Sequence, residues 1–85
     1  MVKPPIRVIS AEYVRGYEIR LRFSDGTSKT VDFSHWMRGE VFRPLATKRK
    51  FKEFFVSGGT VSWPNGADIA PETLYSAADA ASGTA

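Results

Sequence analysis

The sequence predicts an α+β fold: an antiparallel three-stranded meander packed on one face by short helices, with a further short C-terminal strand. Two observations lead to this class. From Ile6 to Phe33, apolar side chains recur at alternate positions between glycine-containing turns, as expected for strands with one buried face. After Phe33 the alternation ends, and aromatic residues follow at helical spacing between glycine and proline breaks.

The turn between the second and third strands is expected to be a three-residue loop, Ser24-Asp25-Gly26. This loop sets Ile19 opposite Val31, which gathers the apolar side chains on one face of the sheet. A two-residue turn would set the same apolar side chains opposite polar ones. We therefore expect Gly26 to adopt the left-handed conformation of a bulged hairpin.

The same comparison for the first hairpin favours Val14-Arg15-Gly16 as its loop, with Ala11 opposite Ile19 and Tyr13 opposite Tyr17. The other face of the sheet is expected to be wet or to meet a polar partner. Its side chains are charged or hydroxylated, namely Glu12, Glu18, Arg20, Arg22, Thr30 and Asp32.

Two short helical segments are expected after the meander. Ser34 is a suitable cap for a turn that ends at Gly39 and lies over the core. Thr47 is a suitable N-cap for a helix whose aromatic side chains lie on one side. These aromatic residues are Phe51, Phe54 and Phe55.

The C-terminal part begins after a glycine pair, with a short strand at Thr60-Val61-Ser62-Trp63. Pro64-Asn65-Gly66 forms the turn that ends this strand, and Pro71 suits the first position of a short helix. The last ten residues, 76–85, are small or polar. We therefore expect one domain over residues 1–75 and a disordered tail at 76–85.

Composition limits the class of protein further. A chain of 85 residues without cysteine must be held by one packed core, with neither disulfides nor thiolate metal sites. No apolar run approaches the roughly 20 residues of a membrane span, and the first residues lack the apolar core of a signal peptide. We expect a soluble cytoplasmic protein that does not insert into membranes.

Catalytic chemistry finds little support in the residue types present. Nucleophilic catalysis needs an activated nucleophile beside an oriented base, but there is no Cys and only one His, His35. A single histidine is more often a surface or lid residue than a proton shuttle or ligand. The glycine pair also lacks the context of a phosphate-binding loop. We predict no catalytic residue, no metal site, no cofactor and no enzymatic activity.

Two segments are candidates for binding. In the first, an exposed edge of Trp63 is expected beside polar groups that contact a partner. The alternative is structural, because Asn65-Gly66 is a strong turn signal and Asp68 can accept turn amides. The candidate partner-binding residues are Trp63, Asn65, Asp68 and Tyr75.

The second candidate is the basic stretch from Arg43 to Lys52, which places cations in the first turn of a predicted helix. The helix dipole disfavours them there, and an anion such as a phosphate backbone or an acidic protein surface would relieve this conflict. The alternative is a solvated basic face. The candidate anion-binding or nucleic-acid-binding residues are Arg43, Lys48, Arg49, Lys50 and Lys52.

Three segments also carry a resemblance to a known family. They are Phe23-Ser24-Asp25-Gly26, Gly39-Glu40-Val41-Phe42-Arg43-Pro44-Leu45 and the block from Trp63-Pro64-Asn65-Gly66-Ala67-Asp68 through Pro71 to Leu74-Tyr75. From about Ile9 to Tyr75 the chain resembles the bacterial domain of unknown function family number 2442.

The resemblance implies a small α+β fold without an established activity. Similar proteins are often encoded beside another short protein, in pairs that look like toxin and antitoxin modules, and some relatives carry a helix-turn-helix domain. The leading hypothesis is thus a non-catalytic module that binds another small bacterial protein, as the antitoxin-like or regulatory member of a gene pair. It would bind through the block from Trp63 to Tyr75 or by β-strand addition at a sheet edge. The alternative is a nucleic-acid-binding accessory protein. The oligomeric state cannot be predicted from the sequence.

Overall fold

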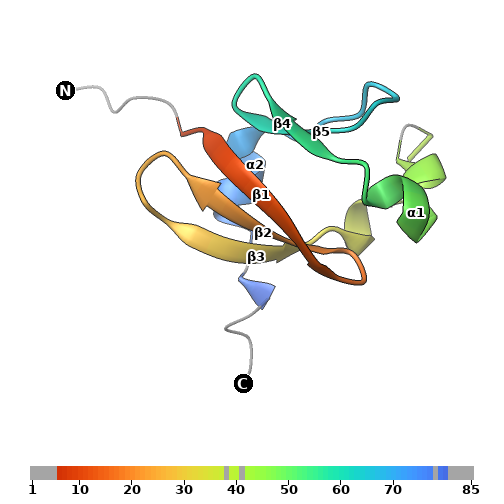
Figure 1. Cartoon of the computed structure of the whole chain (residues 1–85), viewed down its shortest axis with the longest axis horizontal. Helices are drawn as coiled ribbons and strands as arrows, with labels where there is room; N and C mark the ends of the chain where they lie inside the picture. The colour runs from red at the N-terminus through yellow and green to blue at the C-terminus, as the bar shows by residue number, and fades with distance from the viewer. Residues whose placement is uncertain (1–5, 38, 41, 78, 81–85) are drawn as a thin grey trace.

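The computed structural model describes residues 6–37, 39–40, 42–77 and 79–80. The first sheet has the strand order β1-β2-β3, and a second sheet pairs β4 with β5 (Figure 1). The strands are β1 (Val8–Arg15), β2 (Glu18–Phe23), β3 (Ser28–Asp32), β4 (Phe55–Ser57) and β5 (Thr60–Ser62). The helical segments are the 3₁₀ turns η1 (Ser34–Trp36) and η2 (Arg43–Ala46) and the helices α1 (Lys48–Phe51) and α2 (Pro71–Ser76). The predicted α+β class is confirmed.

The predicted register between β2 and β3 is confirmed. Ile19 lies opposite Val31 and Leu21 lies opposite Lys29. The N–H of Phe23 donates to the carbonyl of Thr27 at 2.8 Å, which leaves Ser24-Asp25-Gly26 as the loop. Gly26 has φ +91°, a conformation that a side chain would strain.

The predicted register between β1 and β2 is wrong by two residues. Ala11 lies opposite Leu21 and Tyr13 opposite Ile19, and the turn consists of Gly16 and Tyr17. Irregularities between Val8 and Ser10 and between Tyr13 and Arg15 each insert an extra residue into β1, so Ala11 and Tyr13 still face the core.

The bulges expose apolar side chains that the simple alternation would bury. Ile9, the inserted residue in the first bulge, is 56% exposed, and Val14 in the second is 44% exposed. Tyr17 enters the turn instead of the strand, and its ring packs against Phe51 at 5.2 Å. Its hydroxyl donates to the carbonyl of Ala46. In the observed register, Tyr17 therefore lies in the turn and packs on Phe51, whereas the predicted register placed it in the strand opposite Tyr13.

The helix predicted after Thr47 is shorter than expected. Thr47 is its N-cap, without a side-chain capping bond, and α1 ends at Phe51. Phe55 begins β4 and is 44% exposed, so the prediction that it packs from the helix is wrong. The reason lies in Gly58 and Gly59, whose positive φ values close a tight turn that pairs β4 with β5.

The predicted cap at Ser34 is also different. Phe33 is the N-cap of η1, and no side-chain capping bond is made. Instead, Oδ1 of Asp32 accepts the backbone N–H of Ser34 at 2.9 Å. The turn after β3 is therefore held by a carboxylate at the end of the strand itself.

The core is an aromatic cluster centred on Phe51 and Trp63. The two rings lie 5.8 Å apart, and Phe33 packs against both at 5.9 Å. Nε1 of Trp63 donates to the carbonyl of Phe51 at 2.8 Å, so the buried indole has a polar partner. This cluster joins the second sheet and α1 to the meander.

The folded part extends beyond the predicted boundary at residue 75. Helix α2 begins at Pro71, as predicted, and runs to Ser76. Nζ of Lys29 then donates to the carbonyls of Tyr75 and Ala77, the second at 2.9 Å. Oδ1 of Asp79 accepts the N–H of Thr30 at 3.1 Å, and Thr30 is buried rather than wet. Residues 81–85 of the expected tail lie outside the described residues.

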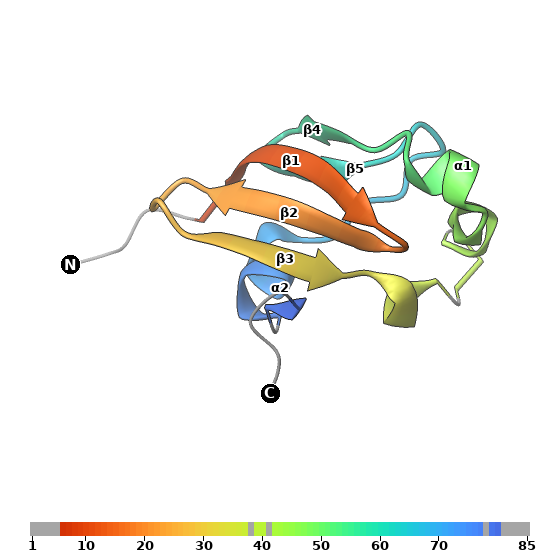
Figure 2. The same cartoon turned by 60° about the horizontal axis from the view of Figure 1, so that its bottom comes forward.

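These contacts place α2 beside β3 (Figure 2). The β4–β5 hairpin lies beside β1, where the N–H of Val8 donates to the carbonyl of Gly59 at 2.8 Å. None of the described helices is long and apolar enough to span a bilayer.

Trp63→Ala should lower the free energy of unfolding by about 3–5 kcal/mol, because it removes a buried aromatic side chain. Trp63→Phe should cost about 1–3 kcal/mol, because it leaves the Phe51 carbonyl without its donor. Urea unfolding followed by far-UV circular dichroism measures both. Phe55→Ala is the control at an exposed position, and an equal effect of all three changes would contradict this description of the core.

Candidate functional site

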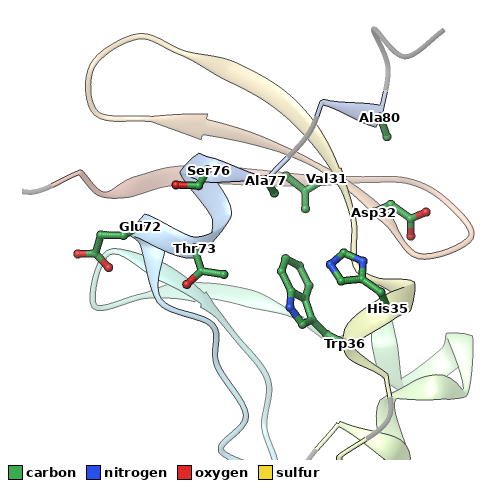
Figure 3. A pocket seen from close by; sticks show the side chains of 9 residues that line it. All are labelled: Val31, Asp32, His35, Trp36, Glu72, Thr73, Ser76, Ala77 and Ala80. Carbon is green, nitrogen blue, oxygen red and sulfur yellow. The ribbon is translucent and has the colours of Figure 1, made fainter. Parts of the chain in front are cut away.

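A surface groove lies between the end of β3, η1 and α2 (Figure 3). Its volume is about 690 Å³ and its surface is mostly apolar. Its lining consists of Val31, Asp32, His35, Trp36, Glu72, Thr73, Ser76, Ala77 and Ala80. The groove joins two segments that are far apart in the sequence.

One wall is aromatic and comes from η1. The rings of His35 and Trp36 lie 4.2 Å apart with an interplanar angle of 42°. Trp36 also packs edge-on against the buried Phe33 at 5.2 Å. Since Asp32 accepts the N–H of Ser34, the start of this wall is fixed to the end of β3.

The other wall is α2, which is anchored on the β2–β3 hairpin through Tyr75. Its hydroxyl donates to Oδ2 of Asp25 at 2.6 Å, and its ring packs edge-on against Phe23 at 5.1 Å. Nζ of Lys29 lies 5.3 Å from the centre of the same ring. In Figure 3, Thr73 lies on the groove side of α2, while Glu72 extends at its outer end.

The groove contains titratable groups but no assembled catalytic centre among the residues that the structure describes. A catalytic triad built on histidine needs that histidine to be hydrogen-bonded to a nucleophile and to an orienting group. Within the described ranges, the interaction found for His35 is its ring contact with Trp36. The described residues also contain no group of three His, Asp or Glu side chains that could hold a metal ion.

The structure does not bring the first set of predicted site residues together as an exposed patch. Trp63 is 1% exposed, so the prediction of an exposed indole edge is wrong. The reason is that its ring completes the core beside Phe51. Oδ1 of Asn65 accepts the N–H of Ala67 at 3.1 Å, as the turn interpretation expects. Asp68 is exposed and its backbone pairs with Ser62.

Tyr75, the fourth residue of that set, has a positioning role in the groove. It holds α2 against Asp25 on the hairpin. Binding of a partner by Asn65, Asp68 or Tyr75 stays a prediction.

The basic residues of the second set are all exposed, and they divide into two groups. Nζ of Lys52 lies 4.8 Å from the ring centre of Tyr13, and Nζ of Lys48 lies 6.0 Å from that of Tyr17. In the described part of the chain, Arg43, Arg49 and Lys50 form no ion pair. Because α1 has only four residues, it lacks the N-terminal dipole on which the predicted anion site depended.

The groove residues themselves were missed as a site by sequence reasoning. His35 and Trp36 were expected to form part of a lid over the core, and Asp32 was expected on the wet face of the sheet. Glu72 and Thr73 follow Pro71 in a helix that was predicted without a role. Adjacent aromatic residues directly after a strand are the signal that could have indicated an exposed aromatic wall.

The fold and the groove define a small α+β domain built on an antiparallel meander, with an aromatic surface groove beside its third strand. The chain belongs to the family described as protein of unknown function (DUF2442), whose model matches residues 8–80. This match confirms the family resemblance found in the sequence. No curated protein and no solved structure matches the chain.

The contact between Tyr75 and Asp25 should depend on pH. Hydrogen bonds from the Tyr75 hydroxyl and then from Thr27 lower the pKa of Asp25 below its ordinary value of 3.8. Since the folded pKa lies below the unfolded one, this stabilisation is present above the unfolded pKa and is lost as pH falls through the folded pKa.

Tyr75→Phe should raise the pKa of the Asp25 carboxyl, because it removes the largest cause of the shift. Nuclear magnetic resonance titration of the side-chain carboxyl carbon measures this pKa directly. Far-UV circular dichroism of both proteins checks that the fold is retained. An unchanged Asp25 titration would show that the hydroxyl does not hold this carboxylate in solution.

Proposed function

We propose that this protein is a non-catalytic interaction module that holds a segment of a second small protein in the groove between η1 and α2. The observation that supports this most directly is the groove itself, which is open and mostly apolar. Its carboxylates, Asp32 and Glu72, are exposed and lie at its sides in Figure 3. An apolar surface with a polar rim is typical of protein-binding sites.

The groove is also built from elements that are fixed before any partner arrives. Trp36 rests on Phe33, and α2 is held to the hairpin by Tyr75 and Lys29. Binding to a preformed surface avoids the entropy cost of ordering its walls. Aromatic side chains such as Trp36 are enriched among the residues that contribute most to interface affinity.

The partner in this proposal is a small protein encoded beside the gene for this chain. An antitoxin-like or regulatory role within such a gene pair, in a bacterial cytoplasm, is the version of the proposal that the family resemblance supports. It rests on analogy with relatives, because a fold alone does not determine a function.

A second candidate function is nucleic-acid binding through the basic stretch. The observation that favours it is the exposure of Arg43, Arg49 and Lys50, which form no ion pair with the described residues. Lys48 and Lys52 support it less, because their ammonium groups already lie over tyrosine rings. Contacts to the phosphate backbone of a nucleic acid are mainly electrostatic, so this function does not require an exposed aromatic side chain at the basic surface.

Thr73→Tyr should block the groove, because it places a ring where Thr73 faces Trp36 (Figure 3). We expect the affinity for the product of the neighbouring gene to fall at least about tenfold, equivalent to about 1.4 kcal/mol. Isothermal titration calorimetry with the co-expressed partner measures this loss.

The matched control is Ser57→Tyr on β4, which adds the same ring outside the groove. It should leave the affinity unchanged. Equal affinities of both variants and the unmodified protein would place the partner elsewhere, and no binding at micromolar concentration would count against the leading proposal.

Arg49→Glu combined with Lys50→Glu tests the second candidate. If nucleic acid is the ligand, binding to a fluorescent duplex should weaken steeply with salt and be lost in the variant, because phosphate contacts release counterions. Fluorescence anisotropy at several salt concentrations measures both effects. The absence of any anisotropy change at low salt would exclude this function for the isolated chain.

A further inference from the structure

Strand β3 lies at one edge of the first sheet, and its outward groups can be assigned. The N–H of Phe23 bonds the carbonyl of Thr27, and the N–H of Phe33 bonds the carbonyl of Tyr17, both at 2.8 Å. Backbone groups in an antiparallel pair alternate between the partner strand and the opposite side. Ser28, Thr30 and Asp32 therefore direct their N–H and C=O groups away from β2.

Three described residues near the C-terminal end, Tyr75, Ala77 and Asp79, cover part of this edge, and none of the three lies in a strand. Oδ1 of Asp79 accepts the N–H of Thr30 at 3.1 Å, which confirms that this amide faces outward. Nζ of Lys29 donates to the carbonyls of Tyr75 and Ala77. A side-chain carboxylate thus occupies the position that a neighbouring strand's carbonyl would take, a way to protect an exposed edge from pairing.

The protected edge and the groove are continuous. Val31 and Asp32 line the groove, and they are also the last residues of β3. A strand added along this edge would place alternate side chains beside Val31, Trp36 and Ala77. Beside the groove end of β3 lie the exposed carboxylates of Asp32 and Glu72, which form no ion pair with the described residues, although Oδ1 of Asp32 accepts the N–H of Ser34. The basic side chains of Arg20 and Lys29 lie at the other end, beside Ser28 and Thr30.

Charge and shape together indicate the chemistry of the occupant. An apolar floor calls for apolar side chains at alternate positions, and the two carboxylates call for basic side chains near the groove end of β3. A second copy of β3 would not supply these, because its Lys29 is held by the carbonyls of its own α2 region. An extended apolar and basic segment of another protein fits better.

We propose that the partner segment binds as an added β-strand on the edge of β3, with alternating apolar and basic side chains, and displaces Asp79 from the N–H of Thr30. This inference rests on the proposed function and specifies how the segment is held. Asp79 then competes with the partner, so the C-terminal segment lowers the affinity of the site for weakly matched strands.

The probe is the acetylated and amidated peptide Val-Arg-Val-Arg-Val, added to the isotopically labelled protein. Binding should slow the amide exchange of Ser28 and Asp32, because each would gain a strand neighbour, whereas the Thr30 amide exchanges the Asp79 carboxylate for a backbone carbonyl. The same peptide methylated at its three interior nitrogens keeps its side chains but cannot donate those hydrogen bonds. It should bind at least about tenfold more weakly, because it loses roughly one or two hydrogen bonds.

Val-Glu-Val-Glu-Val is the charge control and should not bind.

Asp79→Ala tests the competition. It should tighten binding of the unmodified peptide by about three- to tenfold, because one competing hydrogen bond is removed. Glu53→Ala is the matched control, since it removes a negative charge at an exposed position outside the groove. Thermal unfolding of both variants checks that the fold is retained.

The outcomes separate this inference from the proposed function. If the peptide binds but the exchange of the β3 amides is not slowed, or if the methylated peptide binds equally well, the partner segment is not held as an added strand. Docking in the groove would then still be supported. No binding of the arginine peptide at millimolar concentration, or self-association of Asp79→Ala in its absence, would overturn the inference. Loss of partner binding in Thr73→Tyr would still support the proposed function.

Discussion

The packing around Phe51 is the interaction on which the rest of the structure depends. Its ring contacts those of Tyr13, Tyr17, Phe33, Phe54 and Trp63. These partners lie in β1, in the first turn, directly after β3 and directly beside the strands of the second sheet, so a single side chain connects these parts of the fold. With no cysteine in the chain, this aromatic packing takes the place that disulfides hold in many small domains.

The sequence predicted the parts of the fold that local pattern controls. The β2–β3 register followed from matching apolar faces, and the left-handed Gly26 followed from the loop length. The predicted β1–β2 register was wrong because the bulges at Ile9 and Val14 cannot be recognised in an alternating sequence pattern. The helix after Thr47 was predicted too long because Phe54 and Phe55 fit a helical period. In the structure, the Gly58-Gly59 turn places Phe55 in a hairpin instead.

The site was harder to predict because it depends on contacts between distant segments. Trp63 stands in a block that resembles the family, yet its side chain is part of the core and donates a hydrogen bond to the carbonyl of Phe51. The groove needs η1 and α2 on the same side of β3. That arrangement is set by Tyr75 with Asp25 and by Lys29 with the end of α2, and neither contact follows from periodicity or turn chemistry.

The anchor between Tyr75 and Asp25 spans 50 residues and has a consequence for the order of folding. The hairpins of the meander join residues that are close in the sequence and form quickly. Contacts between distant residues form more slowly, because a longer loop must close. On a ribosome, the meander and its aromatic turn emerge well before Pro71. The wall of the groove that η1 provides can therefore form before the wall that α2 provides, because α2 needs the contact of Tyr75 with Asp25.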